Sequence, residues 1–86
     1  MDSEKKLKDC REKIDRIDSN IIELIMRRFV LVRKVGSLKK QAGLPVRNKK
    51  RELEIIGSLA KKSGLKKTFL GRLYRTIFEE AYRLEK

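Results

Sequence analysis

A charged residue interrupts an apolar pattern in the first half of this sequence. Arg28 has the same heptad register as Leu7, Ile14, Ile21 and Val35, which predicts that it lies on an apolar helical stripe. A charge on such a stripe costs on the order of several kcal/mol unless it is paired or binds a ligand. A buried ion pair or a polar residue that sets the helix register would explain a lone arginine, and a bound anion is the functional alternative.

Other basic residues near this stripe favour the anion. Lys39 follows Arg28 by eleven positions, close to three helical turns, so both point to nearly the same side. Arg11 has the register of Lys39 but lies 28 positions before it, roughly 42 Å along a helix. If two copies pair antiparallel about a two-fold axis near residues 21–22, Arg11 of one copy lies level with residues 32–34 of the other. Two equivalent cationic sites, each built from both chains, would result.

The later part of the chain adds two pairs of candidate residues. Arg51 and Glu52 fall in the first turn of a predicted helix, where the helix dipole disfavours an arginine and a ligand would explain it. Ala81 and Glu85 are one turn apart on the apolar stripe of the last predicted helix. Taken alone, Glu85 is explained equally well if it is a solvated residue near the C-terminus.

Three helices must position these residues, which predicts an all-α fold and a single domain over residues 1–86. The helices are expected over about 4–42, from 48 to 63, and from about 67 to the C-terminus. The caps and breakers that set these bounds are Asn48, Gly43, Pro45 and Ser63-Gly64.

Apolar residues recur on one face of each helix. On the first helix they form a heptad seam: Leu7, Cys10, Ile14, Ile17, Ile21, Leu24, Leu31, Val35, Leu38 and Ala42. The inner face of the second helix carries Leu53, Ile56, Leu59 and Ala60. The stripe of the third helix is Leu70, Leu73, Ile77, Ala81 and Leu84, broadened by the aromatic residues Phe69, Tyr74, Phe78 and Tyr82. We expect these aromatic side chains in the core rather than as a stacking platform, and Cys10 as a small buried residue.

The length of the first helix predicts a dimer. About 38 helical residues would be roughly 57 Å long, whereas a compact domain of this size has a radius of gyration of only ~12 Å. The residues that follow cannot cover such a helix. We therefore expect an antiparallel homodimer whose long helices lie side by side.

The composition excludes several kinds of site. The chain has no His, which rules out imidazole metal sites and Ser-His or Cys-His nucleophilic chemistry. A single Cys forms no intrachain disulfide, and no segment is long and apolar enough for a membrane span, so we expect a cytoplasmic protein without a membrane partner. The 24 Lys and Arg residues against 12 Asp and Glu give a net charge of +12, which attracts anions of any kind.

At these residues the sequence resembles the helical chorismate mutases, a family that often forms an intertwined three-helix dimer. The matching stretches are Arg11-Glu12-Lys13-Ile14-Asp15-Arg16-Ile17-Asp18, Arg27-Arg28, Val35-Gly36-Ser37-Leu38-Lys39, Pro45-Val46-Arg47-Asn48 and Arg51-Glu52. They cover essentially the whole chain, and their order is more specific than any one piece. The resemblance implies an isomerase that converts chorismate to prephenate in phenylalanine and tyrosine biosynthesis, with no cofactor and no metal.

The resemblance also implies how the dianionic substrate is held. Arg28 and the partner subunit's Arg11 would bind its two carboxylates, where guanidinium groups form bidentate pairs. Arg51 would contact the enolpyruvyl carboxylate side. Two positions depart from some relatives, because Asn48 stands in place of Asp and Ala81 in place of a hydroxyl residue. Both departures are expected to weaken substrate binding.

The remaining implied roles concern the reacting atoms. Lys39 would donate to the ether oxygen of the breaking C–O bond and touch a carboxylate, Glu52 would accept from the ring hydroxyl, and Glu85 would be the second donor to the ether oxygen. The rearrangement is intramolecular, so orientation and stabilisation of the developing charge are what the site must supply. An ionised Glu85 would repel the substrate, so it must be protonated to donate. We therefore expect activity to rise as the pH falls below neutral.

Three alternatives accompany this interpretation. An isochorismate-pyruvate lyase would act on a near-identical dianion, although Arg51-Glu52 and the Lys39 region resemble the mutases more closely. A basic helical module that binds nucleic acid would account for the charge, although the basic clusters lie on different helices without a recognisable binding motif. These clusters are Lys39-Lys40, Lys49-Lys50-Arg51, Lys61-Lys62 and Lys66-Lys67. A coiled-coil dimerisation domain leaves Arg28 unexplained. The prediction is thus a chorismate-binding homodimer with no nucleic-acid partner.

Overall fold

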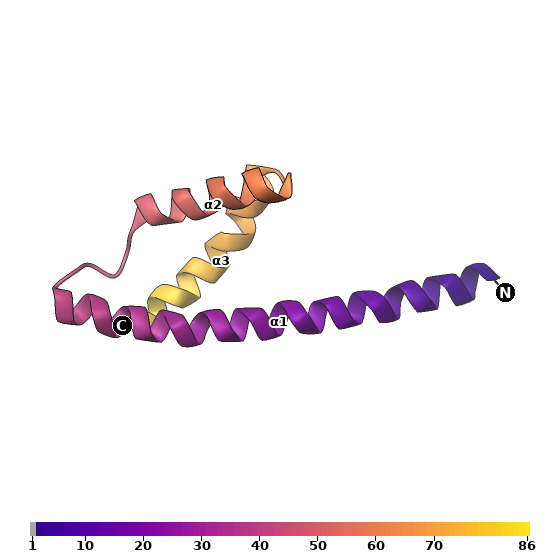
Figure 1. Ribbon diagram of the computed structural model, residues 1–86, viewed down its shortest axis with the longest axis horizontal. Coiled ribbons are helices and arrows are strands. Elements are labelled where there is room, and N and C mark those ends of the chain that lie inside the picture. The colour runs from indigo at the N-terminus through magenta and orange to yellow at the C-terminus, as the bar shows by residue number, and fades with distance from the viewer. Residues whose placement is uncertain (1) are drawn as a thin grey trace. The chain divides into compact units, whose positions relative to one another are not determined.

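The chain folds into the three predicted helices in a computed structural model, which describes residues 2–86 (Figure 1). Helix α1 spans Asp2–Ala42, α2 spans Lys49–Ser63 and α3 spans Lys67–Glu85. The described residues contain no strand, so the all-α prediction is confirmed. The chain divides into two compact units, one ending at Val30 and the other comprising Leu31–Lys86.

The unit that ends at Val30 is a single helical segment without a core. None of its described residues, 2–30, is buried. Its large seam residues are between 47% and 59% exposed, namely Leu7, Ile14, Ile17, Ile21 and Leu24. Cys10 is exposed as well. The prediction that Cys10 is buried is therefore not met within the chain, because a lone helical segment has no second element of its own to pack against.

The turn after α1 follows the local signals in the sequence. Gly43 takes the left-handed conformation, with φ 69°. Its N–H donates to the Lys40 carbonyl at 3.3 Å, and the Leu44 N–H donates to the Lys39 carbonyl at 2.8 Å. These bonds satisfy carbonyls that the end of the helix leaves open. Pro45 then prevents continuation, so the predicted stop is confirmed.

Helix α2 begins and ends where its caps predict. The Asn48 side-chain oxygen accepts from the Arg51 backbone N–H at 3.0 Å, which satisfies one of the open N–H groups of the first turn. Gly64 is left-handed with φ 75°, and its N–H donates to the Ala60 carbonyl. The three-residue connection to α3 is correspondingly tight.

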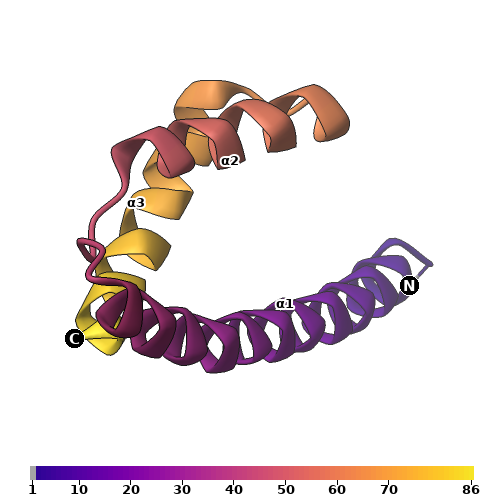
Figure 2. The ribbon, with the colours of Figure 1, turned by 60° about the vertical axis from the view of Figure 1, so that its left-hand side comes forward.

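The core of the unit Leu31–Lys86 lies on one face of α3. Its buried side chains are Leu70, Phe78, Ala81, Tyr82 and Glu85. Figures 1 and 2 show α3 returning from the end of α2 to the last part of α1. Three predicted core positions are wrong for the chain by itself, since Leu53, Phe69 and Leu73 are 72%, 44% and 46% exposed. The short α2–α3 pair cannot cover apolar residues all round both helices, so only the side where the helices meet is buried.

Candidate active site

An ion pair joins the last turns of α1 and α3. The Lys39 Nζ lies 2.6 Å from Glu85 Oε1, and their side chains are 18% and 5% exposed. The same ammonium donates to the Val46 carbonyl at 2.6 Å. An ammonium has three N–H donors, so two are directed at protein acceptors and one remains for a further acceptor. The chain thus holds a charged donor at a fixed, largely desolvated position.

Gly36 allows α3 to come this close to α1. It is the one buried residue of α1. A Cβ built at this position would lie 2.7 Å from both the Glu85 Cα and the Glu85 carbonyl oxygen, which is closer than a real methyl group tolerates. Because Gly36 precedes Lys39 by one helical turn, the contact brings the Glu85 carboxylate level with the Lys39 ammonium. Sequence reasoning gave Gly36 no role, and only its place beside Lys39 could have suggested one.

A second polar cluster joins α3 to the first turn of α2. The Tyr82 hydroxyl donates to Glu52 Oε2 at 2.6 Å and accepts from the Asn48 backbone N–H at 3.2 Å. The Tyr82 ring also lies under two cations, with Lys39 Nζ 5.8 Å and Arg47 Cζ 5.1 Å from its centroid, within the range of cation–π attraction. Burial, and then the hydrogen bond to Glu52, raise the pKa of Tyr82. Its hydroxyl therefore remains a donor throughout the neutral range.

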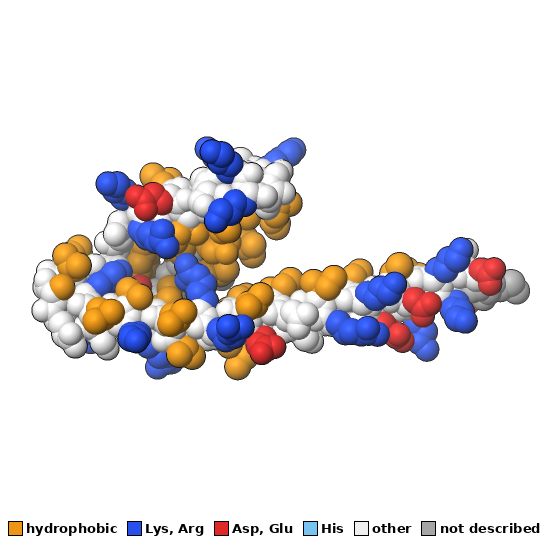
Figure 3. Space-filling model, in the orientation of Figure 1, with side chains coloured by type: hydrophobic (Ala, Val, Ile, Leu, Met, Phe, Trp, Pro, Cys, Tyr) orange, Lys and Arg blue, Asp and Glu red, His pale blue; other side chains and the backbone are white. Residues whose placement is uncertain are grey.

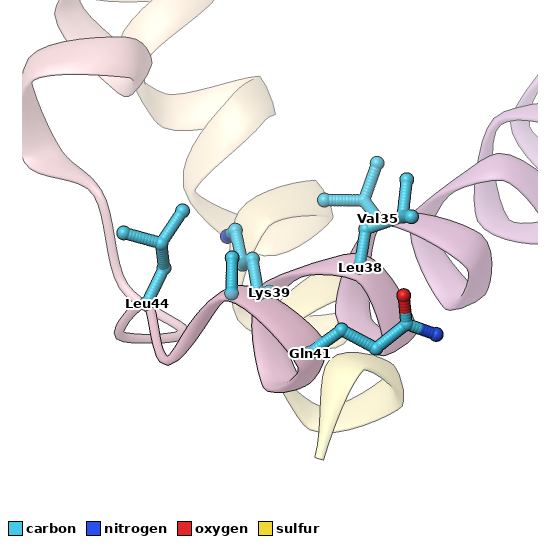
Figure 4. Close-up of a pocket in the computed structure, with 6 residues that line it drawn as sticks. Val35, Leu38, Lys39, Gln41 and Leu44 are labelled. Atoms are coloured by element: carbon cyan, nitrogen blue, oxygen red, sulfur yellow. The ribbon is translucent and has the colours of Figure 1, made fainter.

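The hollow beside Lys39 is mostly apolar. Six residues line it: Val35, Leu38, Lys39, Gln41, Ala42 and Leu44. Figure 4 shows these side chains on the last turns of α1 and the connection that follows. Lys39 is the one charged side chain of the six. A low-polarity wall next to a fixed ammonium strengthens its attraction for an anion.

The structure brings together some of the predicted site residues. Lys39 and Glu85 pair where α3 reaches α1, and Ala81 is buried one turn before Glu85 on the same helix. Tyr82 ties Glu52 and Asn48 to this end of α3. Sequence reasoning placed Tyr82 in the core, which is confirmed, but did not foresee its hydrogen bonds.

The three predicted arginine ligands are placed differently. The Arg51 backbone takes part in the cap of α2, while its side chain is 66% exposed and lies 3.9 Å from Glu54. Arg11 and Arg28 both lie on α1 in the unit that ends at Val30. Their roles as ligands for substrate carboxylates stay predictions.

Two further features bear on the class of protein. Among residues 2–86, no helix has the length and apolar character needed to cross a bilayer. Within the same range, the side chains of His, Cys, Asp and Glu form no group of three suited to a metal ion.

Comparison with known proteins identifies relatives over nearly the whole chain. The family model described as chorismate mutase type II matches residues 10–86. A chorismate mutase from Methanocaldococcus jannaschii is 32% identical over 84 residues, covering 94% of this chain and 85% of the relative. The T-protein of Haemophilus influenzae is 34% identical over 79 residues, covering 88% of this chain and 21% of the relative.

A bifunctional chorismate mutase/prephenate dehydratase from Buchnera aphidicola is 34% identical over 89 residues, covering all of this chain and 23% of the relative. The chain therefore spans less than a quarter of the length of these two longer relatives. No solved structure matches the chain.

Proposed function

Because the chain belongs to the chorismate mutase type II family, we propose that it catalyses the rearrangement of chorismate to prephenate. The observation that carries this proposal is the position of the Lys39 ammonium. It donates to Glu85 and to the Val46 carbonyl, and its third N–H is available to donate to a substrate. A preorganised donor of this kind is what a reaction without nucleophile or base requires. We place the step in phenylalanine and tyrosine biosynthesis.

The chemistry assigns two tasks to the site. One C–O bond breaks while one C–C bond forms within the same molecule, so the protein must hold the enolpyruvyl arm over the ring. It must also stabilise negative charge that develops on the ether oxygen. Lys39 donates to this oxygen. The bond electrons are redistributed within the substrate, so the reaction consumes no cofactor or metal.

Glu85 has to change its role between the empty and the occupied site. In the structure it accepts from Lys39, whereas a second donor to the ether oxygen must carry a proton. We propose that Glu85 is protonated when it donates.

We also propose that the protein is a homodimer with two shared sites. Support comes from the apolar seam of α1, which remains exposed from Leu7 to Leu38. Figure 3 shows hydrophobic side chains running along this helix. Antiparallel pairing of two such helices would bury the seam and bring the partner subunit's Arg11 between Arg28 and Lys39. The substrate carboxylates would then be bound by arginines of both chains.

The proposal is tested by following the loss of chorismate absorbance with purified protein. Prephenate should be identified as the product, without added metal, at several pH values. Sedimentation in the same buffer should give the mass of a dimer. A folded dimer that leaves chorismate unchanged at every pH would contradict the proposal, and isochorismate and then duplex nucleic acid would be the next ligands to assay.

A further inference from the structure

Tyr82 occupies a position that core packing alone does not explain. Its side chain is buried at 9% exposure, yet its hydroxyl makes two hydrogen bonds to α2. It donates to Glu52 Oε2 at 2.6 Å and accepts from the Asn48 N–H at 3.2 Å. A buried hydroxyl that is satisfied on both sides fixes the groups it contacts.

The contact with Tyr82 restricts the orientation of the Glu52 side chain. Glu52 lies in the first turn of α2 and is half-buried, and the Tyr82 hydroxyl engages only one of its two oxygens. The hydrogen bond restricts the rotation of a side chain that otherwise has three flexible torsions. The second oxygen, Oε1, is thereby given a defined direction while it keeps its capacity to accept.

The position of Tyr82 on α3 connects this contact with the reacting centre. Tyr82 and Glu85 are three residues apart and share one helix face, and both are buried. The last turn of α3 therefore carries the residue that meets Lys39 and the residue that meets Glu52. The Tyr82 ring also lies 5.8 Å from Lys39 Nζ.

We propose that Tyr82 is a positioning residue that orients the Glu52 carboxylate toward the ring hydroxyl of the substrate. The inference rests on the proposed function, in which Glu52 accepts from that hydroxyl. In this role Tyr82 acts through Glu52, since its hydroxyl is already bonded to Glu52 and to the Asn48 N–H. Its hydroxyl sets the angle of Glu52 and, through the Asn48 N–H, holds the first turn of α2 against α3.

The first experiment compares kcat and KM for the parent and Tyr82→Phe, which keeps the ring and removes the hydroxyl. We expect kcat/KM for chorismate to fall about 10-fold, the order expected when a charged group loses one hydrogen bond. Tyr74→Phe, which removes a hydroxyl from the same helix, is the matched control and should retain the parental value. Urea denaturation of each variant separates loss of folding from loss of activity.

Two comparisons distinguish positioning from a merely structural role. In a Glu52→Ala background, Tyr82→Phe should change kcat/KM less than two-fold, because the side chain that Tyr82 orients is absent. For a chorismate analogue without the ring hydroxyl, Tyr82→Phe should have little effect on binding. An equal loss in both backgrounds, or with both ligands, would overturn the inference.

A titration tests the contact without any change at Tyr82. Burial raises the pKa of Tyr82 most, the hydrogen bond to Glu52 and the charges of Glu52 and Glu85 raise it further, and the Asn48 N–H lowers it. Lys39 and Arg47 lie over the ring. Glu52→Gln should therefore lower the pH at which tyrosinate absorbance develops.

The outcomes separate this inference from the proposed function. An unchanged tyrosinate titration, or a Tyr82→Phe variant as active as the parent, would overturn the inference alone. A parent protein with no turnover of chorismate would overturn the proposed function, and the role of Tyr82 toward substrate with it.

Discussion

The two ends of α1 differ in how far the rest of the chain covers them. Near its C-terminal end, Gly36 is covered by the backbone of α3 and Lys39 is paired with Glu85. In residues 2–30, no described side chain is buried, although the same heptad pattern continues through both parts. A heptad pattern therefore indicates which face is apolar but not what covers it. The covered end holds the Lys39–Glu85 pair within the chain, and the uncovered end carries the apolar seam that the proposed dimer would bury.

The covered end is tested most severely at Lys39. Lys39→Met removes the charged donor, and we expect kcat to fall about 10²- to 10³-fold, as for loss of an oxyanion donor. The matched control is Lys40→Met, since the neighbouring Lys40 contacts the Lys86 carbonyl instead and should leave the rate within a few fold. Stopped assays with prephenate quantified as product are suitable for rates this low.

Loss of Lys39 also leaves Glu85 buried without its partner, which destabilises the fold. Lys39→Met combined with Glu85→Gln removes both charges and should recover stability but not activity. A double variant that regains activity would show that Lys39 acts only on folding.

The uncovered end is tested by mixing two inactive variants. If each site combines Lys39 of one chain with the partner subunit's Arg11, an Arg11→Ala chain and a Lys39→Met chain form one intact site in each mixed dimer. Half of randomly formed dimers are mixed, and each mixed dimer has one intact site out of two. Refolding the two variants together should therefore restore about a quarter of the parental activity. Activity that stays at the average of the two separate variants would place both residues in the same chain's site.

The pH dependence of kcat tests the role of Glu85 at the covered end of α1. Only the protonated carboxyl can donate to an ether oxygen, so in the proposed mechanism kcat should rise as the pH falls below neutral. Glu85→Gln carries a permanent N–H donor, and its rate should be nearly independent of pH. A parental rate that does not vary with pH would show that Glu85 does not donate.

The smallest effect concerns the close approach at Gly36. Gly36→Ala places a methyl group against the Glu85 backbone, and overpacking of this kind costs about 1–3 kcal/mol in the free energy of unfolding. Gly71→Ala is the control, because a Cβ there meets nothing within 4 Å, and the better helix propensity of Ala should make it neutral or stabilising. Urea unfolding of both variants measures the difference. Equal stabilities would show that α3 is free to move away from α1.

Local signals made the helix bounds predictable from the sequence. Gly43, Asn48 and Gly64 act on their own neighbours, and each takes the conformation or hydrogen bond that its type favours. The resemblance to a family predicted that Lys39 and Glu85 lie in one site, and the two side chains form an ion pair. The roles of Arg11 and Arg28 stay predictions.

Long-range packing decided what the sequence could not. Leu53 and Leu73 have the right periodicity for a core, yet exposure depends on which sides of α2 and α3 meet. The Tyr82–Glu52 hydrogen bond joins residues 30 positions apart and depends on the packing of two helices. A tyrosine at core spacing gives no indication of where its hydroxyl points.

The Lys39–Glu85 contact has a consequence for the order of folding. It closes a loop between residues 46 positions apart, whereas the turns of α1 need only contacts four residues away. Closing a long loop lowers the conformational entropy of the chain before any stabilising contact has formed. We therefore expect the helix around Lys39 to form before its contact with Glu85. During synthesis, the last turn of α3 must have left the ribosome before the Lys39–Glu85 ion pair can form.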